Sequence, residues 1–289
     1  MKRLVIYASL FALLFLIPGC GKPETTESIH TNHSVSITSP TTSVAATTSL
    51  TTTTTTAALA TTATTNKTDP ITETTPSTMT LKTLGNLSYY LYTPRNPTEN
   101  MPLILYLHGG TNKNADVTAL LTTDGFPNYL YDGYYGDLRA YVAVPKLNKQ
   151  YKGWGDVTEQ ITALLDHLTA TYSIDTHKLA LTGHSMGGTG TYQLQINLPD
   201  TFACIAPMSG SVQNTADTVN ALSKTNVWAF VGTADTVIDP NSGRAIIKAL
   251  QENGASATLT ELRGATHRDV PALAYKNPRL IQWLVSGGQ

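Results

Sequence analysis

Hydrophobic positions follow two different rhythms from about residue 85 to the end of the chain. Continuous apolar runs, such as 102–110 (PLILYLHGG) and 202–209 (FACIAPMS), are typical of buried strands. In the stretch 156–172 the apolar residues recur every three or four positions, as on one face of a helix. Stretches of both kinds alternate, which predicts the α/β class: a mostly parallel central sheet with helices on both faces.

The same criteria place the other expected elements. Further strands are expected at 87–94, 139–146, 178–183, 226–232 and 256–262. Further helices are expected at 114–122, 187–199, 241–254 and 278–286. Asp156 and Asp239 suit the N-cap positions of the helices that follow them, because a short acceptor side chain satisfies the first free N–H groups of a helix.

The beginning of the chain, residues 1–19, has the pattern of an export signal. Lys2 and Arg3 precede an apolar run at 4–17 that is too short to span a membrane. The run leads into Pro-Gly-Cys20, which resembles the bacterial lipobox, whose cysteine is lipid-modified and becomes the new N-terminus. We therefore expect an exported protein that is lipid-anchored to the cell membrane through Cys20 and otherwise extracytoplasmic. The alternative is an ordinary secretory signal that happens to contain a cysteine.

Threonine and serine dominate residues 20–80, and aromatic residues are scarce there. Such a composition buries too little apolar surface to offset the entropy lost on ordering, so we expect a disordered tether. Residues 81–289 have an ordinary globular composition with no further shift. They are numerous enough for one domain with a well-buried core.

Charge and cysteine usage exclude several classes of function. The formal net charge is -1 without a clustered basic face, so nucleic acid is not expected as a partner. Neither a G-x-G-x-x-G after the first strand nor a P-loop lysine supports nucleotide binding. Of the 2 cysteines, Cys20 is assigned to lipid and Cys204 lies in an apolar run where a buried thiol is expected. No disulfide framework and no cysteine metal site are therefore expected.

The motif Gly183-His184-Ser185-Met186-Gly187 matches the G-x-S-x-G pattern of a serine nucleophile. It follows an expected strand and opens an expected helix, which is the context that the motif requires. Such a turn strains the serine backbone and lifts its hydroxyl clear of the sheet. Side chains two positions before and after would collide, and glycine removes them. We expect Ser185 to be a nucleophile, and it then needs a general base.

His267 is the expected base among the 7 histidines. It follows the last expected strand and precedes a helix, and the base of such a site belongs on a late loop. Two of the others lie in the expected tether. Four have other expected places: His167 on a helix, His177 at the far end of the sheet, His184 pointing away from Ser185, and His108 as a structural hydrogen-bonding group.

The carboxylate that orients the base is expected from the loop before it, in chain order Ser, Asp, His. Asp235 and Asp239 both follow the strand at 226–232. Asp239 already has a capping role, so Asp235 is preferred.

An oxyanion hole completes such a site, with backbone N–H groups directed at the developing negative charge. One donor is expected from Met186, the residue after the nucleophile. The other is expected from Gly110, with Thr111 as the next candidate. The alternative is that His108-Gly109-Gly110 is only a turn.

From about residue 85 to the end, the chain resembles an α/β-hydrolase of the compact esterase and prolyl-oligopeptidase-like type. The resemblance rests on the segments YLHGG, LTGHSMGGTGTY, LPDTFACIAPMSG, VGTADTVIDP and GATH. It implies an α/β-hydrolase fold without a large lid and acyl transfer to water: Ser185 attacks, His267 carries the proton, and Asp235 fixes the imidazole. It implies no metal and no organic cofactor.

The substrate is less well defined by the sequence. Trp154 and the tyrosine-rich segment 128–138 are expected either to line a pocket for a sugar or phenolic ring or to pack the loops. An extracytoplasmic carbohydrate esterase acting on acetyl or feruloyl groups of a polysaccharide is the favoured interpretation. A prolyl-oligopeptidase-like peptidase and a non-catalytic surface binding module are the alternatives, and the sequence does not indicate an oligomeric state.

Overall fold

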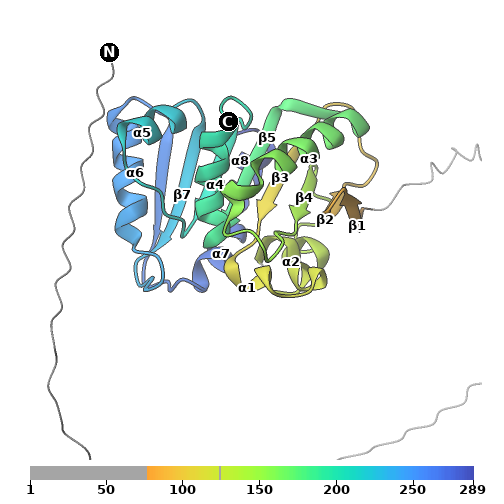
Figure 1. Ribbon diagram of the computed structural model, residues 1–289, viewed down its shortest axis with the longest axis horizontal. Coiled ribbons are helices and arrows are strands. Elements are labelled where there is room, and N and C mark those ends of the chain that lie inside the picture. The colour runs from red at the N-terminus through yellow and green to blue at the C-terminus, as the bar shows by residue number, and fades with distance from the viewer. Residues whose placement is uncertain (1–76, 124) are drawn as a thin grey trace, which may run out of the picture. The chain divides into compact units, whose positions relative to one another are not determined.

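An eight-stranded sheet forms the centre of the domain (Figure 1). The computed structural model describes residues 77–123 and 125–289. The strands are β1 (Thr78–Leu84), β2 (Leu87–Thr93), β3 (Met101–Leu107), β4 (Tyr141–Pro145), β5 (Ile174–His184), β6 (Cys204–Met208), β7 (Asn226–Gly232) and β8 (Ala257–Leu262). Their order across the sheet is β1-β2-β4-β3-β5-β6-β7-β8. The pairs β1–β2 and β2–β4 are antiparallel and the other neighbours are parallel, which confirms the expected mostly parallel sheet.

Helices cover both faces of the sheet (Figure 1). One face carries α3 (Thr158–Thr171), α4 (Met186–Asn197), α5 (Ala216–Leu222) and α6 (Pro240–Glu252). The other carries α2 (Gly125–Tyr131), α7 (Asp269–Tyr275) and α8 (Pro278–Val285). Short helical turns lie in the loops after β3 and β4: α1 (Gly110–Lys113), η1 (Val117–Leu121) and η2 (Trp154–Val157).

Alternation along the central strand β3 divides the core into two layers. Leu103, Leu105 and Leu107 pack beneath the face that carries α3, α4 and α6. Ile104 and Tyr106 pack beneath the face that carries α2, α7 and α8. Every residue of β3 is buried, because helices cover the sheet on both sides. The continuous apolar run in the sequence reflects this double burial.

Several elements differ from the expectation. β1 begins at Thr78, ahead of the expected domain boundary at 81; the threonine-rich composition assigns residues 78–80 to the tether. The segment 114–122 forms only the short turn η1. Asp156 does not cap α3, which begins at Thr158; its carboxylate instead accepts the N–H groups of Lys152 (2.7 Å) and Gly153 (3.3 Å).

The parallel strands end together at the lower edge of the sheet in Figure 1, near α1 and α7. In open α/β sheets this carboxyl edge is where ligands bind. Among residues 77–123 and 125–289, no helix is long and apolar enough to cross a membrane. The expected signal, Cys20 and most of the expected tether lie outside the described residues.

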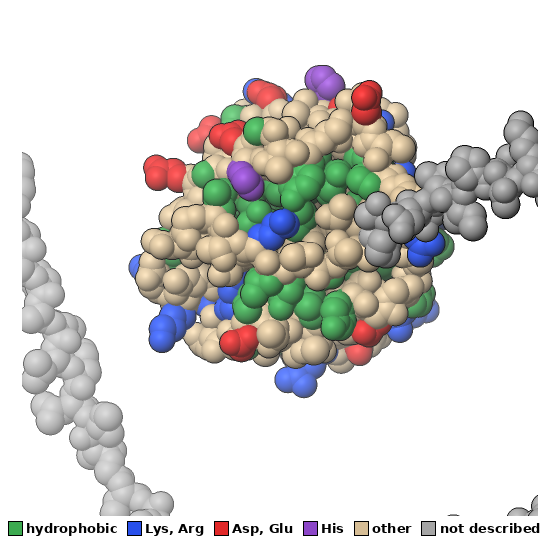
Figure 2. Space-filling view, turned by 90° about the vertical axis from the view of Figure 1, so that its right-hand side faces the viewer, with side chains coloured by type: hydrophobic (Ala, Val, Ile, Leu, Met, Phe, Trp, Pro, Cys, Tyr) green, Lys and Arg blue, Asp and Glu red, His purple; other side chains and the backbone are tan. Residues whose placement is uncertain are grey.

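β1 is the outer strand at one side of the sheet. Figure 2 views the molecule from that side, where apolar side chains gather with lysine or arginine between them. Leu81, near the middle of β1, is 46% exposed. The strand is therefore held mainly by its pairing with β2.

Candidate active site

Ser185 occupies the turn between β5 and α4. Its backbone has φ 60° and ψ −118°, a conformation that residues with side chains rarely adopt. The Ser185 N–H donates to Met208 O (2.9 Å), and the Ser185 carbonyl accepts from the Thr189 N–H (2.9 Å). These bonds hold a strained turn that places the hydroxyl at the carboxyl edge of the sheet.

Two glycines allow this turn to form. A Cβ on Gly183 would lie 2.6 Å from Leu107 O, and a Cβ on Gly187 would lie 1.9 Å from the same oxygen. Both distances are far inside van der Waals contact, so the first turn of α4 can approach β3 only without these side chains. The structure confirms the expected reason for both glycines.

His267 lies on the loop between β8 and α7 and contacts both other predicted residues. Its Nε2 is 2.8 Å from Ser185 Oγ, and its Nδ1 is 2.8 Å from Asp235 Oδ2. An ionised carboxylate only accepts hydrogen bonds, so Nδ1 donates to Asp235 and Nε2 is left to accept from the Ser185 hydroxyl. The imidazole is thus in the tautomer that a base for Ser185 requires.

Asp235 is fixed in the loop after β7. Its Oδ1 accepts the N–H groups of Val237 and Ile238, both at 2.9 Å. Burial alone would raise the pKa of this carboxyl, but the hydrogen bonds from Ile238, His267 and Val237 outweigh burial and hold the pKa below its usual value. The carboxylate therefore stays ionised beside the imidazole.

The competing candidates have structural partners instead. Asp239 caps α6, where its carboxylate accepts the Asn241 N–H (2.9 Å). His108 donates from Nδ1 to Gly109 O (2.8 Å) and accepts the Leu147 N–H at Nε2 (3.0 Å), as expected for a structural hydrogen-bonding group.

Two helices begin close to Ser185. Met186 and Gly110 are the first residues of α4 and α1, and N–H groups at such positions have no partner within their own helix. A Cβ on Gly109 would lie 3.7 Å from Ser185 Cβ, so the loop before α1 passes beside the serine. These positions are compatible with the expected oxyanion hole.

His184 takes a place that the sequence does not predict. Its ring lies against the ring of His267, with centroids 4.6 Å apart, and its Nε2 donates to the His267 carbonyl (2.9 Å). Burial, followed by the nearby His267, lowers the pKa of His184 to about 4. No local pattern could have indicated this contact, because the two residues are 83 positions apart.

Residues 87–270, more than half of the chain, match the dienelactone hydrolase family. The chain belongs to this family. A bifunctional acetylxylan esterase/xylanase, XynS20E of Neocallimastix patriciarum, is 27% identical over 169 residues, or 55% of this chain and 23% of that protein. Poly(3-hydroxyalkanoate) depolymerase C of Paucimonas lemoignei is 29% identical over 145 residues, or 44% of this chain and 32% of that protein. The chain thus spans less than a third of either relative.

Solved structures with the same fold include esterases. A thermostable esterase superposes with a TM-score of 0.61 and 21% identity, covering 73% of this chain and 63% of that one. The feruloyl esterase module of Clostridium thermocellum, solved with sinapinate, has a TM-score of 0.56 and 17% identity, covering 69% and 88%. These likenesses show the α/β-hydrolase fold.

Trp154 does not line a substrate pocket. The expectation that it binds a sugar or phenolic ring is wrong, and its alternative, packing of the loops, describes its place. The side chain is fully buried, with 0% exposed. Its indole N–H donates to His108 O (3.1 Å). On its other side lies Gly190, where a Cβ would be only 2.5 Å from Trp154 Cβ. Trp154 therefore packs η2 against α4.

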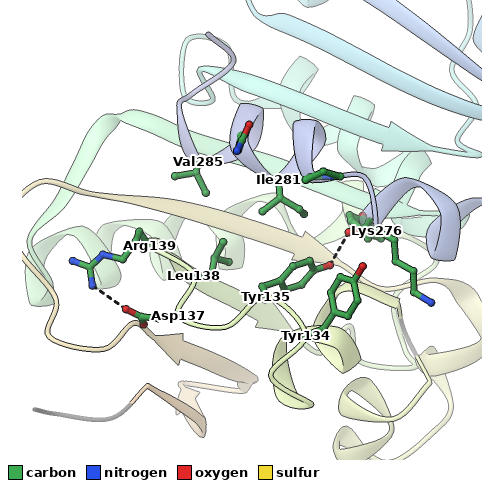
Figure 3. A pocket seen from close by; sticks show the side chains of 11 residues that line it. Tyr134, Tyr135, Asp137, Leu138, Arg139, Lys276, Ile281 and Val285 are labelled. Atoms are coloured by element: carbon green, nitrogen blue, oxygen red, sulfur yellow. Dashed lines mark hydrogen bonds and ion pairs between the residues drawn. The ribbon is translucent and has the colours of Figure 1, made fainter.

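The tyrosine-rich segment 128–138 lines a cavity, but not beside Ser185. Tyr134 and Tyr135 border a cavity of about 470 Å³ together with Ile281 and Val285 of α8 (Figure 3). The Tyr135 hydroxyl donates to the backbone carbonyl of Tyr275 (3.0 Å). Ser185, Asp235 and His267 are not among the residues that line this cavity.

A different groove borders α4. It has a volume of about 520 Å³ and is lined by Gln193, Ser211, Val212, Gln213 and Thr218. The Ser211 N–H donates to Thr189 Oγ1 (3.1 Å), which joins the wall of the groove to the turn of α4 that follows Ser185. Its lining presents amide and hydroxyl groups without charged side chains. Among residues 77–123 and 125–289, no group of three or more histidine, cysteine, aspartate or glutamate side chains is placed to hold a metal ion.

Proposed function

We propose that the protein cleaves esters through a triad of Ser185, His267 and Asp235. As Ser185 Oγ attacks the ester carbonyl, His267 takes its proton and then passes it to the leaving alcohol oxygen. The acyl group stays on Ser185 until a water molecule, deprotonated by His267, releases it as the acid. Asp235 holds the imidazole tautomer throughout. The observation that carries this proposal is the pair of 2.8 Å contacts from His267 to the other two side chains.

The N–H groups of Met186 and Gly110 are the proposed oxyanion donors, with the Thr111 N–H as the next candidate for the second place. The ester oxygen becomes negative when Ser185 attacks, and fixed N–H donors stabilise that charge more than they stabilise the neutral carbonyl. The positions of Met186 and Gly110 at helix starts support this role, because N–H groups there have no acceptor within their own helix.

The proposed substrate is a polysaccharide that carries acetyl or feruloyl esters, met outside the cytoplasm by a protein lipid-anchored through Cys20. Three observations support this: the export pattern at residues 1–19, the acetylxylan esterase name of a relative, and the groove beside α4. Amides and hydroxyls both donate and accept hydrogen bonds, as the hydroxyl groups of a sugar chain do. We propose that the groove holds the sugar while the acyl group lies at Ser185.

The chain from Gly21 onward can be assayed against p-nitrophenyl acetate, methyl ferulate and acetylated xylan beside a Ser185→Ala variant. We expect turnover by the wild type and a loss of at least about 10³-fold in the variant. An aminopeptidase substrate should not be cleaved. A folded wild-type protein that is inert toward all three esters would contradict the proposal.

Gln213→Ala tests the proposed sugar groove, because Gln213 is exposed on its wall. We expect KM for acetylated xylan to rise about three- to ten-fold, because about one hydrogen bond is lost. KM for p-nitrophenyl acetate should not change. Gln282→Ala, an exposed glutamine on α8, is the matched control. Equal KM values for xylan in all three proteins would place the sugar elsewhere.

A further inference from the structure

His184 connects the strand that carries the nucleophile with the loop that carries the base. β5 ends at His184, one residue before Ser185, and His267 lies between β8 and α7. The Nε2 of His184 donates to the backbone carbonyl of His267 (2.9 Å), and the two rings lie 4.6 Å apart at 42°. His184 thus contacts both the backbone and the ring of His267, and it is itself the residue before Ser185.

The bonds at the imidazole do not by themselves place His267. Its contacts with Asp235 and Ser185 fix the rotation of the ring, but the path of the loop decides whether the ring reaches them. Two residues before His267, the loop is fixed by a hydrogen bond in which the Ala265 carbonyl accepts the Ala234 N–H (3.0 Å). At His267 itself the carbonyl is held by His184.

We propose that His184 is a positioning residue that holds the backbone of His267 at the distance from Ser185 that proton transfer requires. This inference rests on the proposed triad. Because His184 directly precedes Ser185, one rigid turn sets both the Ser185 hydroxyl and the His267 carbonyl. A displacement of about 1 Å at a reacting group can cost about 100-fold in rate, so such a link affects turnover rather than substrate binding.

The chemistry of His184 suits this place. Burial, with the nearby His267 second, lowers its pKa to about 4, so its ring is neutral at neutral pH. A second cation here would oppose the imidazolium that His267 becomes when it takes the proton of Ser185. With Nε2 donating to His267, the unprotonated Nδ1 lies toward Gly109, where an added Cβ would be 4.0 Å away. His184 therefore lies between the loop of the base and the loop before α1.

Two substitutions separate the hydrogen bond from the ring. His184→Phe keeps an aromatic ring and removes the donor, whereas His184→Gln keeps an N–H donor near the place of Nε2 and removes the ring. With p-nitrophenyl acetate we expect His184→Phe to lower kcat about ten-fold at unchanged KM, which corresponds to about 1.4 kcal/mol. We expect His184→Gln to recover most of that loss. His177→Phe, at an exposed position of the same strand, is the matched control and should keep wild-type kcat.

Wild-type kcat in His184→Phe, equal losses in the Phe and Gln variants, or a rise in KM in place of the loss in kcat would each overturn the inference. A measurement on the wild type does not depend on how the variants fold: the ¹⁵N NMR shifts of His184 should report the Nε2–H tautomer, and an Nδ1–H tautomer would overturn the inference. The Ser185→Ala variant distinguishes a failure of the proposed triad from a failure of the proposed role of His184. If Ser185→Ala stays active, the triad fails; if it is inactive while His184→Phe is fully active, only the role of His184 fails.

Discussion

Each of three histidines around the site is held in one tautomer by its neighbours. His267 donates from Nδ1 to Asp235, His184 donates from Nε2 to the His267 carbonyl, and His108 donates from Nδ1 to Gly109 O. Of the three, it is His267 whose remaining nitrogen faces a hydroxyl, that of Ser185. The partner of the second nitrogen thus distinguishes a histidine placed to act as a base from one that forms a structural bridge.

Asp235→Asn and Asp239→Asn form a matched pair on one loop. We expect Asp235→Asn to lower kcat for p-nitrophenyl acetate by about 10³- to 10⁴-fold, because an amide can donate to His267 and so favour the wrong tautomer. Asp239→Asn should keep both kcat and thermal stability, because asparagine caps a helix about as well as aspartate. Similar steady-state constants for the two variants would show that Asp235 is not the orienting residue.

Stability should fall in mild acid because of two buried histidines. Burial lowers the pKa of both His108 and His184 to about 4, against 6.5 as the usual value. Between these values the unfolded chain binds protons that the folded protein does not, so lowering the pH favours unfolding. Urea unfolding should show a loss of about 2 kcal/mol per histidine between pH 7.5 and pH 5. His177→Gln, at an exposed position, should leave this pH dependence unchanged, and a flat profile in the wild type would contradict the assignment.

The sequence predicted Ser185, His267 and Asp235 because their chemistry depends on chain order and on a short local pattern. The structure places all three in contact. Trp154 was misassigned because a tryptophan in a loop at the carboxyl edge suits both a surface and a core position. The deciding partner is Gly190, 36 positions later, whose missing side chain makes room for the ring.

At the scale of elements, the turn between β5 and α4 and the loops around it form one unit. η2 packs on α4 through Trp154 and Gly190, and the loop after β6 bonds to α4 through Ser211 and Thr189. α4 therefore begins directly after Ser185 and supports two neighbouring loops along its first half. A change in the packing of α4 should therefore affect both Ser185 and the groove beside α4.

Gly190→Ala tests the contact between α4 and η2. Its Cβ would lie 2.5 Å from Trp154 Cβ, an atom that cannot move without the backbone, so overpacking should lower the free energy of unfolding by about 2 kcal/mol. Gly153→Ala is the matched control, because its Cβ would meet its nearest neighbour, Gln193 Oε1, at 3.8 Å. In chemical denaturation, Gly153→Ala should change the free energy of unfolding by no more than about 0.5 kcal/mol. Equal stability of both variants would show that η2 moves freely on α4.

Long, strongly patterned elements were predictable, and short or atypical ones were not. The interval 226–232 was expected as a strand and is observed as β7 with the same bounds. β1 was missed because its sequence, TMTLKTL, shares its threonines with the preceding segment and pairs on one side only. The tertiary contact with β2, which local composition does not encode, makes it a strand.

At the scale of the whole molecule, the side chains proposed for catalysis lie at one edge of the sheet, and a cavity beside α8 has a separate lining. Ser185, Asp235 and His267 all follow parallel strands, β5, β7 and β8. The cavity beside α8 is bordered by residues that precede β4 (Figure 3). Ser185, Asp235 and His267 are not among its lining residues.

The membrane anchor proposed at Cys20 can be tested in a bacterial host that expresses the full chain. We expect metabolic labelling with radioactive palmitate and recovery in the membrane fraction, because several acyl chains hold a protein to a bilayer stably. Cys20→Ser should abolish both, while Cys204→Ser, at the buried cysteine, should keep them. Labelling of the Cys20→Ser protein would show that the lipid is carried elsewhere, and an unlabelled wild type would show that the signal is of the ordinary secretory type.

The place where the chain enters the sheet has a mechanical consequence. Thr78, the first residue of β1, pairs with Thr93, and the strand returns to β2 through a tight turn after Leu84. Tension transmitted through the residues ahead of Thr78 would therefore act first on the pairing of β1 with β2. The outer strand would yield at low force and lengthen the connection by about 3.3 Å for each residue released. The strands that precede Ser185, Asp235 and His267 are separated from β1 by at least β2, β4 and β3, so the release of β1 would leave their own pairing intact.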